Sequence, residues 1–573
     1  MTIPNEKMQK KPLVSHKITT ILFSVLILLL IFCVGFLAAV PPTSRDALTH
    51  HLAIPKIYIQ QGGMIELPHI LHSYYPMNLD LLYLIPLYFG NDILPKYLHF
   101  LFALFTASLL FWYLHRRLNI LYALFAALFF LSLPVIVKLS ITVYVDLGLV
   151  FFSTAALILL LVWAESEYKT KYLLLSAIFC GLALGTKYNG LVVLFLLSLF
   201  APFLYLRTEK GKRFAQAKAI GYAALFLLVA LTVFSPWMIR NAIWTGNPVY
   251  PLYNRYFDGQ AAVDKDAEDV PPEIRKRVQY QVGHWNHFAI RRIMFKESWT
   301  QIALIPLRIF FQGQDNKPQF FDGKLNPFLL ILPLVTIFSL SRIPIGQRRD
   351  LKLFAAFIGL FILISFLRTS IRIRYIAPVI PPLVILTAFG CHQIERFFIE
   401  RGRFILGRSI LFAAVIGALG INIHYVINQF RVVEPFSYIS GKVSRDHYIA
   451  YHRPEYPLLK YANQNLSDNQ EILTLFMGNR IYYSDRHMVP GETWFTQMGL
   501  EAASVTDMQE RLYRRGYTHI LANMDLVKQW VKTFELPEQM KIAEFFNKHT
   551  RLLKQNPPYA LLYVNTPVIA SDN

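Results

Sequence analysis

Two carboxylates stand at the ends of long apolar segments in this 573-residue chain. Asp46 follows the first such segment almost directly, and Asp146 opens a later one in Tyr144-Val145-Asp146. An acidic residue at the edge of a membrane span is costly to place and usually functional. Because a positioned carboxylate can accept a proton from a reacting group, Asp46 and Asp146 are the candidate catalytic residues.

Basic residues stand at the ends of other apolar segments. They are Lys187, Arg240, Arg368, Arg372 and Arg374. Arginine suits a phosphate because its planar guanidinium group can donate two parallel hydrogen bonds. Acids beside such cations indicate acid–base chemistry next to a bound anion. The candidate phosphate ligands are Lys187, Arg240, Arg372 and Arg374.

Several of these residues also have a purely structural interpretation. Asp146 and Lys187 can form an ion pair between two helices, and Asp46 can cap the N-terminus of a helix. The arginines near residue 370 can contact lipid headgroups, although they fall where positive residues are otherwise depleted. Asp80 is expected on the polar face of an interfacial helix.

The polar loop that follows Asp46 is rich in histidine and tyrosine. Its histidines are His50, His51, His69 and His72. Histidine and carboxylate together suit a divalent metal, but the spacing matches no tight metal motif, so metal dependence stays open. Aromatic side chains here suit headgroup anchoring or stacking on a sugar ring. The candidate acceptor or sugar ligands are His50, His51, Tyr74 and Tyr75.

The elements that position these residues are membrane spans. The chain is 54% hydrophobic and 15% aromatic, and several segments exceed the roughly 20 apolar residues needed to cross a bilayer. About 11 spans are predicted: 18–40, 94–114, 119–137, 147–164, 172–186, 189–206, 219–236, 325–341, 353–367, 375–391 and 409–427. The net charge of +21 comes from short basic clusters between spans, which argues against nucleic-acid binding.

The basic clusters also predict the orientation. They follow every second span, as cytoplasmic loops do, so the N-terminus is expected in the cytoplasm of a cell-membrane protein. The first span is interpreted as an uncleaved anchor. Loops 41–93 and 237–324 then lie on the outer face with all the candidate residues. Residues 302–311 are apolar but too short to cross, and are expected to form an interfacial or re-entrant helix.

The composition becomes that of a soluble domain from about Gln429. Residues 471–478 have the pattern of a strand and turn, 508–515 that of a helix ending at Gly516, and 517–522 that of another strand. We therefore predict a mainly α, polytopic membrane domain over residues 1–428. A small extracytoplasmic α/β domain is predicted over residues 429–573.

Several short motifs, which follow one another in a characteristic order and are all predicted on the same side of the membrane, carry a family resemblance. They are Asp46-Ala47-Leu48-Thr49-His50-His51-Leu52, Tyr144-Val145-Asp146, Leu184-Gly185-Thr186-Lys187-Tyr188, Pro236-Trp237-Met238-Ile239-Arg240-Asn241 with Trp244 to Pro251, and Arg372-Ile373-Arg374-Tyr375-Ile376-Ala377-Pro378. Over residues 18 to about 430 they resemble the GT-C superfamily of glycosyltransferases, near protein mannosyltransferases and lipid A aminoarabinose transferases. Many relatives have a second acid after the first-loop aspartate, where this chain has Ala47. Their usual Tyr-His-Leu-Pro stretch reads His50-His51-Leu52-Ala53 here.

The resemblance implies a GT-C-like membrane fold and an enzyme that uses a polyprenyl-phosphate sugar. The acceptor would be an extracytoplasmic lipid, glycan or protein, and the transfer would invert C1. Asp46 would be the general base, and Arg372, Arg374 and Lys187 would hold the departing phosphate. Asp146 would orient the acceptor, hold Lys187 or help to bind a metal. An O-antigen polymerase or ligase and a lipid-linked saccharide transporter are the alternatives.

Overall fold

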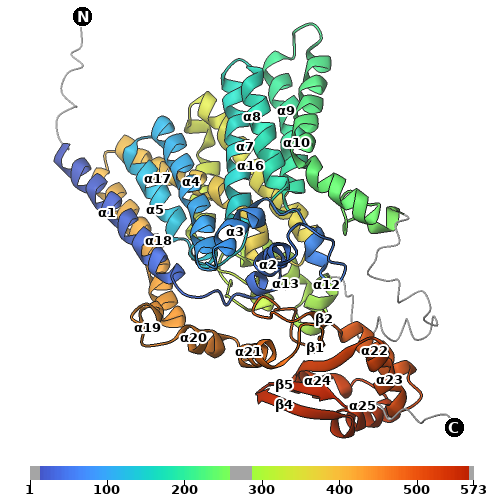
Figure 1. Ribbon diagram of the computed structural model, residues 1–573. Helices are drawn as coiled ribbons and strands as arrows, with labels where there is room; N and C mark the ends of the chain where they lie inside the picture. The colour runs from blue at the N-terminus through green and yellow to red at the C-terminus, as the bar shows by residue number, and fades with distance from the viewer. Residues whose placement is uncertain (1–12, 258–286, 567–573) are drawn as a thin grey trace, which may run out of the picture.

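The computed structural model describes residues 13–257 and 287–566 as a helical bundle joined to a small sheet domain (Figure 1). Eight helices of the described residues are long and apolar enough to cross a membrane. They are α1 (Leu13–Ala38), α4 (Leu94–Arg117), α7 (Asp146–Glu165), α9 (Gly190–Glu209), α10 (Ala215–Thr245), α16 (Ile345–Arg368), α17 (Ile380–Glu400) with the preceding 3₁₀ turn η8 (Ile373–Val379), and α18 (Phe404–Val433).

A ninth candidate span is a bent pair of helices. Helices α5 (Ile120–Ser132) and α6 (Pro134–Ser140) meet at 63°. Pro134 causes the break because it has no N–H to donate and its ring clashes with a continuing helix. The next N–H, of Val135, donates instead to the carbonyl of Lys324 at 3.1 Å. This contact ties α6 to the loop in front of α15 (Phe328–Phe338).

The mainly α membrane fold is confirmed, with fewer long spans than the predicted eleven. Two predicted spans are short apolar helices, α8 (Thr170–Leu184) of 15 residues and α15 of 11 residues. They pack against α7 and α17, respectively. Hydrophobicity identified both segments correctly, but helix ends are set by local residues such as Gly185 after α8 rather than by hydrophobicity.

The loop between α1 and α4 folds into a compact layer on one end of the bundle. It contains a π-helical turn η1 (Ala47–His51), α2 (Ala53–Gln60), the 3₁₀ turn η2 (Leu71–Tyr74) and α3 (Asn78–Tyr88). A buried cluster fixes this layer on the start of α7: Ala47, Leu52, Leu79, Tyr83, Val143 and Val145. The π-helical turn is closed by the Leu52 N–H, which donates to the Ala47 carbonyl at 2.9 Å.

The later loop contains only short helices where it is described. Helix α13 (Trp299–Ala303) and helix α14 (Ile305–Arg308) cover most of the apolar stretch 302–311. This agrees with the prediction that the stretch does not span. Between them and α15, the 3₁₀ turn η6 (Pro318–Phe320) brings Asp315 and Asp322 to the same end of the bundle as α2 and α3.

The chain after α18 forms the predicted α/β domain. Helices α19 (Pro435–Ile439), α20 (Arg445–His452) and α21 (Tyr456–Asn465) lead into a five-stranded sheet of order β2-β1-β3-β5-β4. The strands are β1 (Glu471–Leu475), β2 (Met488–Pro490), β3 (Tyr517–Asn523), β4 (Thr550–Asn556) and β5 (Tyr559–Val564). The helices are α22 (Glu492–Glu501), α23 (Val505–Arg514), α24 (Met524–Val531) and α25 (Leu536–Lys548).

The predicted strands at 471 and 517 and the helix ending before Gly516 are confirmed as β1, β3 and α23. Gly516 has φ of +80°, the left-handed conformation expected after a helix C-terminus. Strands β2, β1 and β3 run parallel to one another, and β5 pairs antiparallel with both β3 and β4. Helix α18 continues beyond the predicted domain boundary at 428. The domain lies at the end of the bundle that carries α2 and α3, away from the start of α1 (Figure 1).

Candidate active site

A cavity of about 490 Å³ lies where the bundle, loop 41–93 and the linker helix α20 meet. This volume is typical of a small-molecule site. Its basic lining residues are Arg45, Lys96, Lys138, Arg372, Arg374 and Arg453. Its carboxylates are Asp46, Asp315 and Asp322. Because basic side chains outnumber acids, the cavity favours an anionic ligand.

Asp46 and Arg374 form the central ion pair of this cavity. A terminal guanidinium nitrogen of Arg374 lies 2.6 Å from Asp46 Oδ2. The guanidinium also lies 4.9 Å from the ring centroid of Tyr144 and 5.4 Å from that of Tyr375. Within the described residues, the buried Nε of Arg374 has no hydrogen-bond partner. Arg374 can therefore donate to a second anion while it pairs with Asp46.

The pair strongly favours the ionised form of Asp46. Burial raises the pKa of this carboxyl, but the positive charge of Arg374, with smaller contributions from His51 and Lys187, brings the pKa to about 2. Asp46 is therefore a carboxylate at neutral pH. With so low a pKa, it is also a weak proton acceptor as long as Arg374 is fully committed to it.

The π-helical turn η1 places Asp46. The residue precedes the turn with helical backbone angles and makes no side-chain capping hydrogen bond. The Asp46 side chain therefore does not cap the N-terminus of a helix, which was its structural interpretation. The Thr49 hydroxyl donates to the Arg45 carbonyl at 2.8 Å and closes the turn around Asp46. Single π-helical turns are rare and frequently occur at functional sites.

Ile373 explains why both neighbouring arginines reach the cavity. Its side chain is fully buried against Gly313 and Gly323, and its N–H donates to the Phe321 carbonyl at 2.8 Å. The flanking Arg372 and Arg374 both line the cavity. Arg372 lies 3.5 Å from Asp322 Oδ2 and stays half-buried.

Asp146 and Lys187 pair with each other. Lys187 Nζ donates to Asp146 Oδ1 at 2.7 Å, and Asp146 is fully buried at the start of α7. The ammonium also lies 5.3 Å from the ring centroid of Tyr375. Neither residue belongs to the described lining of the cavity. The structure thus forms the interhelical ion pair considered from the sequence, and the catalytic and phosphate-binding roles of the two residues stay predictions.

Arg240 lies apart from the other predicted phosphate ligands. Its guanidinium stacks between the rings of Trp237 and Trp244, at 4.7 and 5.0 Å from their centroids. It donates to Asn241 Oδ1 at 2.8 Å and to the Tyr75 carbonyl at 3.1 Å. It is not among the described residues that line the cavity. Its contacts join α10 to loop 41–93.

The histidines form a stacked cluster behind Asp46. The rings of His50 and His72 lie 4.3 Å apart, and those of His50 and His51 lie 4.0 Å apart. His51 Nδ1 lies 2.7 Å from Asp80 Oδ1. The expectation that Asp80 lies on the polar face of an interfacial helix is wrong, because Asp80 is only 3% exposed and burial raises its pKa. Burial and the adjacent histidine charges lower the pKa of His50.

The two predicted tyrosine ligands differ in accessibility. Tyr74 is buried, its hydroxyl donates to Glu66 at 2.7 Å, and burial raises its pKa. Tyr75 packs on His72 and Tyr188 at centroid distances of 5.3 and 5.5 Å.

Between residues 13 and 566, excluding 258–286, no cluster of three or more His, Cys, Asp or Glu side chains is arranged to hold a metal.

Sequence reasoning missed several residues of the cavity. Lys138 lies just beyond the predicted span 119–137, and no hydrogen bond or ion pair of its ammonium is found in the described residues. A lysine at the end of an apolar segment is a signal that could have identified it. Arg453 and Asp315 come from distant parts of the chain and carry no local signal. Lys96 is held by the Val40 carbonyl at 2.7 Å.

Comparison with known proteins gives a family over part of the chain. Residues 76–239 match the family model described as dolichyl-phosphate-mannose-protein mannosyltransferase. This segment contains Asp146 and Lys187 but not Asp46 or Arg374. A search of curated protein sequences gave no significant match.

Solved structures show the same fold over nearly the whole chain. ArnT from Cupriavidus metallidurans, bound to undecaprenyl phosphate, has a TM-score of 0.56 at 12% identity and covers 95% of this chain and 97% of its own. The oligosaccharyltransferase of Archaeoglobus fulgidus, tethered to an acceptor peptide, has a TM-score of 0.54 at 12% identity, with 94% and 73% covered. Residues 76–239 are therefore similar to this mannosyltransferase family, and nearly the whole chain shares the fold of ArnT and of the oligosaccharyltransferase.

Proposed function

We propose that this protein transfers a sugar from a polyprenyl-phosphate donor to an extracytoplasmic lipid, glycan or protein at the cavity that contains Asp46. The observation that carries this proposal is the 2.6 Å Asp46–Arg374 pair in a cavity dominated by basic residues. A carboxylate that can take a proton there lies beside a cation that can hold a phosphate. The fold is similar to that of ArnT, whose structure contains undecaprenyl phosphate, and this similarity supports a polyprenyl-phosphate donor.

The donor phosphate is the leaving group. As the acceptor attacks C1, the bond between C1 and the phosphate oxygen breaks and its electron pair stays on the phosphate. Arg372, the free Nε of Arg374 and the ammonium of Lys138 are the groups that would stabilise this charge. Direct displacement of this kind inverts the configuration at C1.

Asp46 receives the proton that the acceptor hydroxyl or amine loses. In the ligand-free structure its low pKa makes it a poor base. A phosphate beside Arg374 offsets part of the arginine charge and therefore raises the pKa of Asp46. Donor binding thus prepares the base, so the donor is expected to bind before proton transfer.

The apolar side of the cavity suits the lipid part of the donor. Leu37 and Val40 at the end of the first span and Val432 and Val433 at the end of the last described span line it. These residues lie where a prenyl chain would leave the bilayer. We assign this face of the protein to the extracytoplasmic side and the N-terminus to the cytoplasm, on the charge pattern of the loops.

The remaining predicted residues are proposed to support this centre. The Asp146–Lys187 pair lies under Tyr375, whose ring also contacts Arg374. His50, His51, Tyr74 and Tyr75 belong to the layer on the other side of Asp46, where an acceptor would approach. Arg240 would act through Tyr75, because it donates to that backbone.

Membranes that contain the protein and a radiolabelled polyprenyl-phosphate sugar test the proposal. Asp46→Asn is expected to lower transfer about 10²–10⁴-fold, the contribution typical of a general base, while donor binding is retained. Arg372→Ala is expected to weaken donor binding. Arg368→Ala is the matched control, because this nearby arginine is exposed and lies outside the cavity lining.

Two results would contradict the proposal. Normal transfer by Asp46→Asn would remove Asp46 as the base, and unchanged donor affinity of Arg372→Ala would remove Arg372 from the phosphate site. If no polyprenyl-linked donor is consumed while a lipid-linked saccharide crosses the membrane, the transporter alternative is favoured.

A further inference from the structure

The loop that carries Asp46 is held from outside by the C-terminal domain, on both sides of the carboxylate. Before Asp46, the Tyr483 hydroxyl donates to the Pro42 carbonyl at 2.8 Å. After Asp46, the Tyr482 N–H donates to the Leu48 carbonyl at 3.1 Å. The contacts therefore restrain the backbone at both ends of the turn that sets the position of Asp46.

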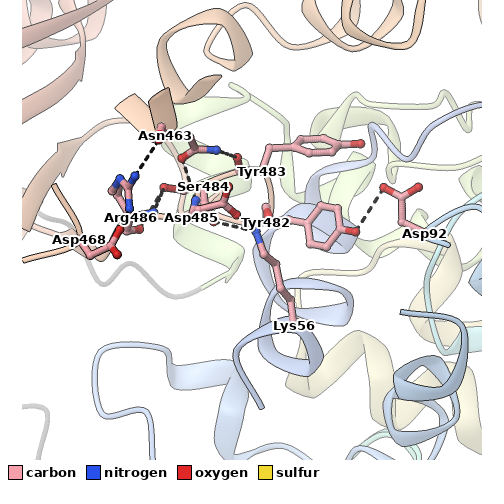
Figure 2. A network of polar contacts seen from close by, with 9 residues as sticks. All are labelled: Lys56, Asp92, Asn463, Asp468, Tyr482, Tyr483, Ser484, Asp485 and Arg486. Carbon is pink, nitrogen blue, oxygen red and sulfur yellow. Dashed lines mark hydrogen bonds and ion pairs between the residues drawn. The ribbon is translucent and has the colours of Figure 1, made fainter. Parts of the chain in front are cut away.

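Lys56 provides the strongest connection between the two parts. This residue lies on α2, directly after the π-helical turn, and its ammonium donates to the Tyr482 carbonyl at 3.0 Å and the Ser484 carbonyl at 2.9 Å. It also pairs with Asp485 at 2.7 Å (Figure 2). An ammonium group has three donors, and all three are used in this one segment of the C-terminal domain.

A second connection joins the same segment to the bundle in front of α4. Asp92 is buried and accepts a hydrogen bond from the Tyr482 hydroxyl at 3.2 Å (Figure 2). It also pairs with Arg445 of α20 at 2.5 Å. Lys56 on α2 and Asp92 in the turn before α4 thus hold Tyr482 from two points of the membrane part. A segment fixed at two points cannot shift without breaking bonds at one of them.

The segment is also fixed within its own domain. Asn463 of α21 donates to the Tyr483 carbonyl at 3.0 Å and accepts from the Asp485 N–H at 2.8 Å. The guanidinium of Arg486 donates to the Asn463 carbonyl at 2.7 Å (Figure 2). The contacts to loop 41–56 therefore come from a rigid edge of the domain.

We propose that residues 478–485, here called the clamp segment, position Asp46 for catalysis, with Lys56 and Tyr483 as the positioning residues. This inference rests on the proposed role of Asp46. Catalytic groups must be held closely, since a displacement of about 1 Å can cost about a hundredfold in rate. The C-terminal domain is then part of the catalytic machinery without contacting the reacting atoms.

The test compares three lysine variants of the full-length protein in proteoliposomes. Lys56→Met removes all the clamp contacts of the ammonium, and Lys56→Arg keeps a donor at the same place. Lys548→Met removes an exposed lysine of the C-terminal domain. We expect Lys56→Met to lower kcat about tenfold or more, with the donor KM within about twofold, because Arg372 and Arg374 lie outside the clamp. Lys56→Arg is expected to recover most of the rate, and Lys548→Met to match the wild type.

The pH profile separates positioning from simple loss of stability. A loosened loop moves Asp46 away from Arg374, so the pKa of Asp46 rises and the acid limb of activity moves to higher pH. Tyr483→Phe removes one hydroxyl only and is the second variant, which decides the question if Lys56→Met does not fold. An unchanged kcat and acid limb in both variants would overturn the clamp. If Asp46→Asn retains full activity, Asp46 is not the base, and this outcome is distinct from a failure of the clamp alone.

Discussion

Removal of the Arg374 charge should change the acidity of Asp46 in a measurable direction. In Arg374→Gln the amide keeps some of the side-chain volume but no longer carries the charge 2.6 Å from the carboxylate. Burial, the largest influence on Asp46, is unaffected and disfavours the ionised form. The pKa of Asp46 is therefore expected to rise from about 2 to 3.8 or above.

The magnitude follows from that pKa. A rise of about two pKa units corresponds to about 2–3 kcal/mol of lost preference for the carboxylate, at 1.36 kcal/mol for each unit. Because the folded-state pKa lies below the usual value, the pair stabilises the fold above about pH 4 and loses this effect as the pH falls toward 2. At neutral pH the variant should be destabilised by up to this amount.

The assay is the pH dependence of kcat/KM for the donor, which reports the ionisation of groups in the free enzyme. The wild type should show no acid limb from Asp46 above about pH 4, whereas Arg374→Gln should show one at or above that pH. Arg374→Lys keeps a positive charge and should therefore keep the acid limb at low pH. Arg372→Gln is the matched control, since this arginine pairs with Asp322 and should change the donor KM only.

The reasoning would be refuted by an acid limb that stays in place in Arg374→Gln. It would also be refuted if Arg372→Gln moved the limb as far as Arg374→Gln does. In either case the ion pair would not control the acidity of the base.

Three other variants test separate parts of the site. Lys138→Gln should raise the donor KM about tenfold with kcat little changed, and donor binding to proteoliposomes as tight as in the wild type would exclude Lys138 from the phosphate site. Asp80→Leu leaves His51 buried without its hydrogen-bond acceptor, which should lower the free energy of unfolding by about 1–3 kcal/mol. The thermal unfolding temperature in detergent should fall, and an unchanged temperature would contradict this. Ala47→Glu places a carboxylate in a fully buried apolar position and should reduce the yield of folded, monodisperse protein. Ala47→Ser should be tolerated. A well-folded glutamate variant would contradict this, because it would show that the buried cluster can repack.

The sequence predicted the membrane fold because its main signals are local. Hydrophobic runs, basic clusters and the strand and turn pattern around Gly516 each depend on neighbouring residues, and the corresponding helices and strands were found. Span length was less predictable. Helices α8 and α15 are mostly apolar but contain only 15 and 11 residues.

The site was predictable only in part, for a physical reason. Asp46, Arg372 and Arg374 stand at span ends, so a topology model brings them to one face. Which cation pairs with which acid depends on side-chain directions and on the π-helical turn, neither of which leaves a local pattern. Asp80 illustrates this, because nothing near it in the sequence indicates that it would be buried and would pair with His51.

The structure explains why Ala47 replaces the second acid of the glycosyltransferases that the sequence resembles. The residue is fully buried in a cluster with Leu52, Leu79 and Tyr83. A second acid at this position would lose its hydration without a partner. The chain therefore relies on one first-loop carboxylate, and its companions in the cavity, Asp315 and Asp322, come from another loop.

The clamp contacts also set an order of events during biosynthesis. The Lys56 ammonium donates to the Tyr482 carbonyl across a separation of 426 residues. At typical ribosomal rates of about 5–20 residues per second, the loop with Asp46 waits about 20–90 s for the segment that will hold it. A partly made chain, although most of its spans are already inserted, lacks that contact. The enzyme should gain its activity only with its last hundred residues, which limits sugar transfer by unfinished molecules.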